Sequence, residues 1–342
     1  MKNNRRYWGV LTPQPAANLA QAVREAEGFG LEGLWVAQIY SPPFTTLAAA
    51  AMASQRLKLG TGVALAFARS PLETALSAID LDIISGGRAV LGLGTSLRWL
   101  NEACHGVTYG KPLTHLREVV RIVRELIAGA HTGKLGRIDG EYHKLDLTNF
   151  KTLGPPIRAR IPIYLPAVFE SAVQMAAEIG DGLPGHPIWS ARWIGNEVKQ
   201  NLEASLKRVG RRRSEFDLNI WAWVAIDKDR KRAIEDSRAT VASYLGYPQY
   251  EKYYAAHGFG PQACAIAEAS RRGDAAAALK TVSDEMVNTF AIAGTPDEAR
   301  ERIDELWETA DSMTLVPPLF SALDNTKIAA YQKAIADTFY RV

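Results

Sequence analysis

A chain of 342 residues with a hydrophobic content of 47% is long enough for two ordinary domains or for one α/β barrel, which fills about 250 residues or more. Its 40 basic and 37 acidic residues leave a net charge of +3, and this balance argues against a nucleic-acid partner.

Cys104 and Cys264 are far apart and form neither a zinc pattern nor a redox pair, so we expect no metal site and a cytoplasmic location. We also expect no membrane partner, because no run approaches the roughly 20 apolar residues of a membrane span and the basic amino terminus lacks a signal-peptide core.

The first part of the chain alternates short apolar runs with helical periodicity. Strands are predicted over residues 6–11, 34–37 and 57–65, and helices over 18–29, capped by Asn18, and 45–53. A strand and helix that repeat about every 30 residues favour a parallel sheet with right-handed crossovers.

The alternation continues to the end of the chain, with two interruptions. Residues 133–147 predict a surface hairpin, and the alanine-rich and tyrosine-rich residues 246–288 predict a helical insertion, which is either a lid over the carboxyl ends of the strands or a structural extension. Counting gives about eight strands and eight helices, so we expect residues 1–342 to form a single (β/α)8 TIM barrel. The remaining predicted elements are helices over 113–128, 170–179, 191–209, 228–244, 295–310 and 325–339, and strands over 161–166, 182–186, 218–226 and 313–316.

Residues 70–96 are the most informative stretch. Ser70 and Pro71 begin a helix, Gly86 and Gly87 end it, and residues 89–93 follow as a short buried strand. The small residues 94–96 then leave the carboxyl end of this strand open, which is where parallel α/β proteins bind flat or phosphorylated ligands.

Two linked motifs carry a resemblance to a known family. The run Leu81-Asp82-Ile83-Ile84-Ser85-Gly86-Gly87-Arg88, followed by an apolar strand and Gly92-Leu93-Gly94-Thr95, resembles the luciferase-like flavin and deazaflavin oxidoreductase superfamily, which includes bacterial luciferase and the methylenetetrahydromethanopterin reductases. Residues 59–63 and 66–71 are similar to its coenzyme F420-dependent oxidoreductases. The resemblance implies a homodimer or higher homo-oligomer that transfers a hydride between coenzyme F420 and a small organic substrate. A monooxygenase that uses reduced FMN, and a cofactor-binding relative without turnover, remain open alternatives.

The resemblance also implies where the cofactor binds. Residues 61–63 would back the ring as a bulge, often with a non-proline cis peptide, which we place between Gly62 and Val63. Residues 94–96 and Asn101 would approach the ring or tail, and residues 167–168 and 180–182 would face the phosphate or ribityl chain through backbone N–H groups, although Asp181 also suits a structural cap. The expected cofactor-binding residues are Thr61, Gly62, Val63, Gly94, Thr95, Ser96, Asn101, Ala167, Val168, Gly180, Asp181 and Gly182.

The catalytic acid or base is less evident. Several deazaflavin dehydrogenases have a histidine after the second strand, where this chain has Gln38, which forms hydrogen bonds but carries no proton at neutral pH. His186, at the carboxyl end of a strand, is the first candidate because histidine titrates near neutral pH, and His105 is the second. We expect His115 and His131 on a helix surface.

Two further residues are candidates for the substrate. Arg69 follows the third strand, where a fixed cation would bind an anionic tail or a substrate carboxylate, or else form a salt bridge that anchors the next helix. Trp189 suits a pocket wall or the core. No third glycine completes a dinucleotide-binding fingerprint, and no phosphate loop or zinc-protease motif occurs.

Overall fold

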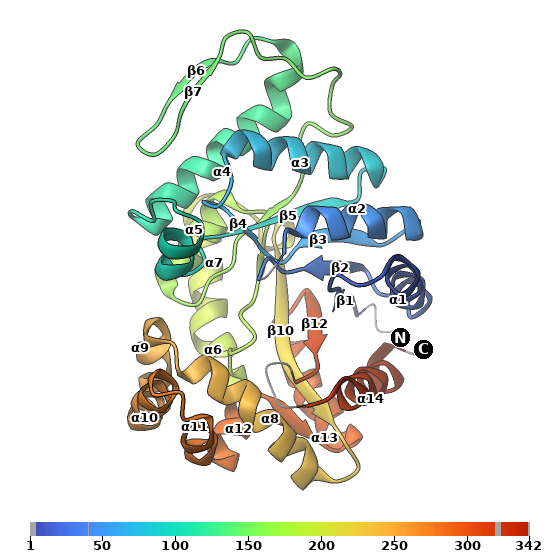
Figure 1. Cartoon of the computed structure of the whole chain (residues 1–342), viewed down its shortest axis with the longest axis vertical. Helices are drawn as coiled ribbons and strands as arrows, with labels where there is room; N and C mark the ends of the chain where they lie inside the picture. The colour runs from blue at the N-terminus through green and yellow to red at the C-terminus, as the bar shows by residue number, and fades with distance from the viewer. Residues whose placement is uncertain (1–4, 40, 319–322, 341–342) are drawn as a thin grey trace. The chain divides into compact units, whose positions relative to one another are not determined.

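The computed structural model describes residues 5–39, 41–318 and 323–340 (Figure 1). By its internal contacts the chain divides into two compact units. The first comprises Met1–Gly185 and Val198–Asn219, and the second His186–Glu197 and Ile220–Val342. Residues 1–4, which make up most of the basic amino terminus, lie outside the described residues, so the expected absence of a signal peptide stays a prediction.

Short parallel strands form the centre of the first unit. Their order is β1-β2-β3-β5-β8-β9, with β4 paired to β5, and each of these pairs is parallel. Nearly every residue in them is buried, as expected for a parallel sheet with both faces covered. The strands are β1 (Tyr7–Val10), β2 (Gly33–Val36), β3 (Lys58–Thr61), β4 (Ala64–Leu65), β5 (Ala89–Gly94), β8 (Ile163–Tyr164) and β9 (Gly182–Pro184).

The helices of this unit alternate with its strands. The capping residues predicted for two of these helices can be compared with the structure. Ser70 caps α3 as predicted, because its Oγ accepts a hydrogen bond from the Glu73 N–H at 3.0 Å. Helix α1 begins two residues before Asn18, and its cap residue Pro15 makes no side-chain capping bond, so the predicted Asn18 cap is wrong. The helices are α1 (Ala16–Gly28), α2 (Pro43–Ala53), α3 (Pro71–Ile84), α4 (Pro112–Gly129), α5 (Glu170–Ile179) and α7 (Lys199–Arg208).

In the first unit, the predicted surface hairpin is confirmed, whereas one predicted strand is corrected. The surface hairpin is confirmed, since β6 (Gly136–Asp139) and β7 (Lys144–Leu147) pair antiparallel after α4, as Figure 1 shows at the top of the view. The strand predicted over residues 57–65 is instead divided into β3 and β4 by Gly62 and Val63.

Strand β10 (Asp217–Ile226) links the two units along the chain. Its first residues pair with β9 in the first unit, and Val224–Ile226 pair with β11 in the second. The predicted helical insertion is confirmed, because the second unit has several short helices between residues 246 and 290. The other elements of the second unit are α6 (Ala191–Trp193), α8 (Arg230–Leu245), α9 (Glu251–Ala256), α10 (Gly260–Arg271), α11 (Ala275–Thr281), α12 (Asp284–Phe290), β11 (Ile292–Gly294), α13 (Pro296–Leu306), β12 (Ser312–Val316) and α14 (Asn325–Ile335).

Parallel strands that alternate with helices throughout the chain confirm the predicted (β/α)8 TIM-barrel class. The assignment of residues 1–342 to one domain stays a prediction. Among the described residues, no helix is both long and apolar enough to cross a membrane.

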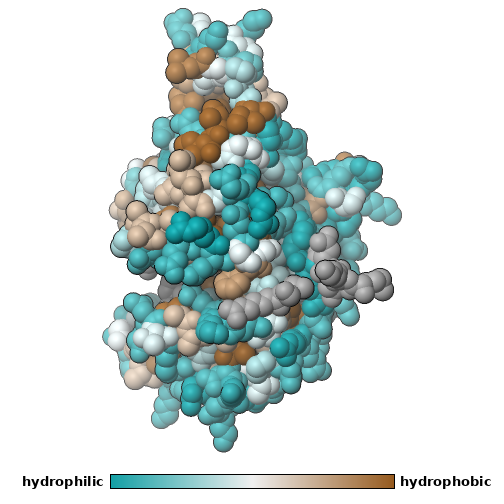
Figure 2. All heavy atoms as spheres, turned by 90° about the vertical axis from the view of Figure 1, so that its right-hand side faces the viewer, coloured by the Kyte–Doolittle hydropathy of each residue, from teal (hydrophilic) through white to brown (hydrophobic). Residues whose placement is uncertain are grey.

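Exposed hydrophobic side chains gather where α2 and α3 end. Met52 is 77% exposed, and Ile83 and Ile84 are 49% and 47% exposed. The two helix ends are tied together by Arg88, whose guanidinium donates to the carbonyl of Ala51. Figure 2, which views the molecule from the right-hand side of Figure 1, shows brown, hydrophobic atoms among hydrophilic ones in its upper part. Exposed hydrophobic side chains that form a contiguous patch commonly mark an interaction site.

Candidate functional site

The break between β3 and β4 has the backbone geometry that the resemblance implies. The peptide bond between Gly62 and Val63 is cis. Thr61 is fully buried, and its hydroxyl donates to the carbonyl of Gly92 at 2.7 Å. The Gly62 N–H donates to the Val36 carbonyl at 2.8 Å, which ties the break to the end of β2. The break therefore joins the carboxyl ends of three neighbouring strands.

Strand β5 passes this break at very short distance. A Cβ on Gly92 would lie 2.0 Å from the Thr61 carbonyl oxygen, and a Cβ on Gly94 would lie 2.6 Å from a methyl carbon of Val63. Only glycine fits such an approach without displacing the backbone or the valine. Beyond Gly94, Ser96 has a φ of 55°, a left-handed conformation that is uncommon for a serine. The turn predicted to approach the cofactor is thus tightly built and free of bulky side chains.

Asn101 is held against the same turn and keeps one polar atom unused. Its side-chain amide donates to the carbonyls of Thr95 and Leu97, each at 2.9 Å. Asn101 is fully buried, and its Oδ1 has no hydrogen-bond partner among the described residues. A buried acceptor without a partner costs about 1 to 3 kcal/mol, so this atom suits a ligand N–H.

The predicted phosphate-binding residues fall at two different ends of the sheet. Ala167 follows β8 and pairs with Gly185, which follows β9, so Ala167 and Val168 lie at carboxyl ends. Gly180, Asp181 and Gly182 instead precede or begin β9, at its amino end. The structure does not bring these two segments together, and their roles stay predictions.

Asp181 is occupied by structural contacts. Its carboxylate accepts hydrogen bonds from Arg124 at 2.9 Å, from Arg160 at 2.5 Å and from the Ile163 N–H at 2.9 Å. A Cβ on Gly182 would lie 2.6 Å from the Tyr164 ring, so close packing accounts for this glycine. These contacts favour the structural cap over phosphate binding.

Gln38 and Arg69 form a pair beside the strand break. Arg69 Nη1 donates to Gln38 Oε1 at 2.8 Å, and the Leu65 N–H donates to the same oxygen at 3.0 Å. The Gln38 N–H in turn donates to the Val63 carbonyl at 3.2 Å. Because two donors already face its oxygen, Gln38 orients Arg69, and the amide carbonyl is not directed at a substrate.

In the second unit, His186 lies among tyrosines. Its Nε2 is 3.0 Å from the Tyr250 hydroxyl, and its ring meets Tyr244 and Tyr250 edge-on. Burial lowers the pKa of His186 to about 3, so the imidazole is neutral at pH 7. The N–H of Ile188 donates to Nδ1 at 3.4 Å, which places the ring proton on Nε2, where it donates to Tyr250.

Two other predicted residues have different surroundings. Trp189 is buried, 5% exposed, and its indole N–H has no partner among the described residues, so it is available to a ligand acceptor. His105 is exposed at the end of the π-helical turn Leu100–Cys104. No three His, Cys, Asp or Glu side chains gather as a metal site in the described part of the chain.

Comparison with known proteins identifies the family. A family model described as luciferase-like monooxygenase matches residues 3–312. The chain belongs to this family.

Relatives within the luciferase-like family are similar over most of their length. A 5,10-methylenetetrahydromethanopterin reductase of Archaeoglobus fulgidus is 36% identical over 297 residues, which cover 83% of this chain and 84% of that protein. A protein of Mycobacterium tuberculosis whose name assigns it to the coenzyme F420-dependent oxidoreductases is 32% identical over 342 residues, with coverage of 95% and 96%. The solved coenzyme F420-dependent tetrahydromethanopterin reductase of Methanopyrus kandleri has a TM-score of 0.81 and 25% identity, with 98% of each chain covered.

Sequence reasoning missed an aromatic cluster behind the Ser96 turn of this luciferase-like chain. His115, expected on a helix surface, is 4% exposed and stacks between Phe67 and Tyr142, at centroid distances of 3.8 and 4.1 Å. Tyr109 stands edge-on to Phe67, and its hydroxyl donates to the Ser96 carbonyl at 2.9 Å. The signal was available, because His115 precedes Val119 and Ile122 at the spacing of the buried stripe of α4.

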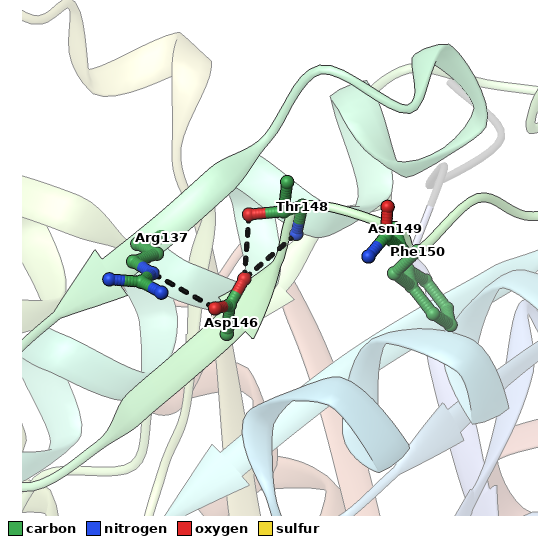
Figure 3. A pocket seen from close by; sticks show the side chains of 5 residues that line it. All are labelled: Arg137, Asp146, Thr148, Asn149 and Phe150. Atoms are coloured by element: carbon green, nitrogen blue, oxygen red, sulfur yellow. Dashed lines mark hydrogen bonds and ion pairs between the residues drawn. The ribbon is translucent and has the colours of Figure 1, made fainter.

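A separate pocket lies on the hairpin of the luciferase-like chain. Its volume is about 460 Å³, and Figure 3 shows Asp146 hydrogen-bonded to Arg137 and Thr148 at its edge. None of the residues predicted to bind cofactor or substrate is among its lining residues, which are Arg137, Asp146, Thr148, Asn149 and Phe150. The pocket on the hairpin is therefore not part of the predicted cofactor or substrate site.

Proposed function

We propose that this chain is an oxidoreductase that transfers a hydride between coenzyme F420 and a small organic substrate. The observation that carries the proposal is the fully buried Asn101 with an unused Oδ1. It stands beside the glycine turn that the family resemblance assigns to the cofactor. The relatives named for F420-dependent reactions support the same cofactor.

The residues present fit a flat ring with N–H groups on one edge. The break at Gly62 and Val63 would back the ring, and the lack of side chains at Gly92 and Gly94 keeps β5 close behind that break. Asn101 Oδ1 would accept an N–H of the ring edge. When bound, the deazaflavin supplies the carbon that donates or accepts the hydride, while the protein positions and shields it.

A catalytic role is proposed for His186, with Gln38 and His105 as further candidates. Because the pKa of His186 is about 3, it would act as a neutral hydrogen-bonding group on Tyr250 and not as an imidazolium acid. Gln38 would act through Arg69, which it orients. His105, exposed beyond the π-helical turn, has the least support of the three.

The alternative is a monooxygenase that uses reduced FMN, which the description of the family model favours. A cofactor-binding relative without turnover is the third reading, because fold does not determine function. Binding preference separates the first two, and turnover separates both from the third.

The test is a fluorescence titration of the purified protein with oxidised coenzyme F420 and, in parallel, with FMN. We expect tight binding of F420 alone and a Kd that rises roughly tenfold in Asn101→Ala, because one hydrogen bond in a buried site is lost. The matched control is Asn149→Ala, an exposed asparagine of the hairpin pocket, which should leave the Kd unchanged. Preference for FMN would reject the F420 proposal and make oxygen consumption the next assay.

We also propose a cytoplasmic homodimer. Self-association is supported by the exposed apolar residues Met52, Ile83 and Ile84, and a reducing compartment by the two exposed, unpaired cysteines. Sedimentation velocity at several protein concentrations should give a dimer mass. A monomer at all concentrations would contradict the proposal.

A further inference from the structure

Arg69 is a partly buried cation at the strand break, and no carboxylate among the described residues forms an ion pair with it. It follows β4 and directly precedes Ser70, the cap of α3. Its guanidinium lies over the ring of Phe44, 5.4 Å from the centroid. Burial lowers the pKa of Arg69, and the negative charge of Glu73 offsets this shift only in part. The described residues therefore compensate the positive charge of Arg69 only in part.

Most of the donors of Arg69 are unused within the described part of the chain. An arginine carries five N–H donors, and the hydrogen bond to Gln38 is the one formed by Arg69 among the described residues. Arg88, which is also partly buried, donates to the backbone carbonyls of Ser85, Leu57, Ala51 and Ser54. The contrast shows that a structural arginine in this unit is saturated, whereas Arg69 is not.

Gln38 fixes the position of these free donors. Both neighbours of its side-chain oxygen, Arg69 Nη1 and the Leu65 N–H, are obligatory donors, so the amide cannot be reversed without losing both bonds. The Gln38 N–H also donates to Val63, which ties the pair to the residue after the cis peptide bond. Arg69 is thus held beside the cofactor-facing strand ends and is ready to form a fork of two hydrogen bonds.

We propose that Arg69 binds the anionic group of the substrate, a carboxylate or a phosphate, so that the substrate class is an organic acid or a phosphate ester. This inference rests on the proposed function for the identity of the reaction. A planar guanidinium with adjacent free N–H groups matches the two oxygens of either anion. Phe44 covers one face of the guanidinium, and Gln38 accepts a hydrogen bond from Nη1. The remaining N–H donors of Arg69 are left for that ligand.

The first arm of the test uses the protein without cofactor. Calorimetric titration measures the binding of benzoate, of inorganic phosphate and of benzamide, the neutral counterpart of benzoate. We expect one of the anions to bind at least about tenfold more tightly than benzamide, and Arg69→Gln to lose that gain, as for a charge-assisted hydrogen bond. The better of the two anions identifies the carboxylate or the phosphate class.

Two further variants test whether a loss of anion binding comes from the charge at Arg69 or from a loss of the folded structure. Gln38→Glu keeps an oxygen acceptor for Arg69 and Leu65 but adds a carboxylate next to the guanidinium, so it should abolish anion binding with Arg69 still present. The control is Arg121→Gln, an exposed arginine on α4 that pairs with Glu125, and it should bind the anions like the wild type. Anion binding that is absent in the wild type, or unchanged in Arg69→Gln or Gln38→Glu, would overturn the assignment.

The second arm distinguishes the substrate from the acidic tail of the cofactor. The Kd of oxidised F420 should change less than about twofold in Arg69→Gln, a difference well below one hydrogen bond. If the variant instead loses F420 affinity and the anions compete with F420, Arg69 binds the cofactor tail and the substrate assignment is rejected. Failure of the wild type to bind F420 would reject the proposed function alone, because the anion titrations do not involve the cofactor.

Discussion

The turn Gly94-Thr95-Ser96 and the segment Gly180-Asp181-Gly182 both contain glycine at the end of a buried strand, but they lie at opposite strand ends. Beyond the end of β5, the buried Oδ1 of Asn101 has no partner among the described residues, and Arg69, which follows β4, forms one hydrogen bond there, to Gln38. At the start of β9, Asp181 is bound by Arg124, Arg160 and the Ile163 N–H. Glycine therefore marks close packing at both places, and the polar atoms without a partner distinguish the proposed ligand site from the structural contact at Asp181.

The largest effect should follow from adding a side chain where β5 closely approaches the break between β3 and β4. In Gly92→Ala the new Cβ would lie 2.0 Å from the Thr61 carbonyl oxygen, so the free energy of unfolding should fall by about 3 kcal/mol through overpacking. F420 binding should be lost with it, and urea unfolding and fluorescence titration measure the two effects. Gly28→Ala is the matched control, because no atom lies within 4 Å of its Cβ position at the end of α1. A stable Gly92→Ala protein that binds F420 normally would mean that this close approach is not needed.

A smaller effect, and of a different kind, is expected at the start of β9. Asp181→Asn removes the charge that faces Arg124 and Arg160, and half-buried ion pairs of this sort should lower the free energy of unfolding by about 1 to 3 kcal/mol. The Kd of F420 should stay the same, unlike in Asn101→Ala. Asp139→Asn serves as the control, since that carboxylate is 81% exposed on the hairpin. A loss of F420 affinity without a loss of stability would restore the phosphate-binding role of residues 180–182.

An effect of similar size, which depends on pH, is expected at His186, the histidine that follows β9. The folded-state pKa of His186, about 3, lies below its unfolded value of about 6.5. The unfolded chain thus takes up the proton first, and stability is complete above pH 6.5 and is lost as the pH falls toward 3. Between pH 7.5 and pH 5 the wild type should lose about 2 kcal/mol more than His186→Gln in urea unfolding. The exposed His105→Gln should behave like the wild type, and equal pH slopes for all three proteins would show that His186 is not neutral in the folded state.

Periodicity and capping patterns predicted most of the fold because their causes are local. Ser70, Pro71 and the glycines after α3 act within one helical turn, and the apolar runs identify strands buried on both faces. The resemblance placed the break at Gly62 and Val63, whereas the apolar run from residue 57 to residue 65 predicted one continuous strand. A local pattern does not show where the backbone leaves the sheet.

The site could be predicted only in part, because its decisive contacts join residues far apart in the chain. The partners of Asp181 lie 57 and 21 residues away, and Gln38 meets Arg69 across 31 residues. No spacing rule connects such pairs, so the sequence predicts a ligand contact both for Asp181, whose carboxylate is taken up by structural contacts, and for Arg69, which forms one hydrogen bond among the described residues. His115 differs, because a histidine is polar by residue type, which predicts a surface position, whereas its spacing matches the buried stripe of α4.

The interleaved order of the units has a consequence for how the protein is made. Arg6 pairs with Glu32, which emerges soon after it, but also with Asp217, which follows 211 residues later. At a synthesis rate of about 5 to 20 residues per second, roughly 10 to 40 seconds pass between the synthesis of Arg6 and that of Asp217, its second partner. Arg6 therefore lacks its Asp217 partner while residues 7–216 are translated, and β9 lacks the first residues of β10 until they follow. Premature release of a fragment that ends before residue 217 would leave the buried Tyr164 hydroxyl without its Asp217 acceptor.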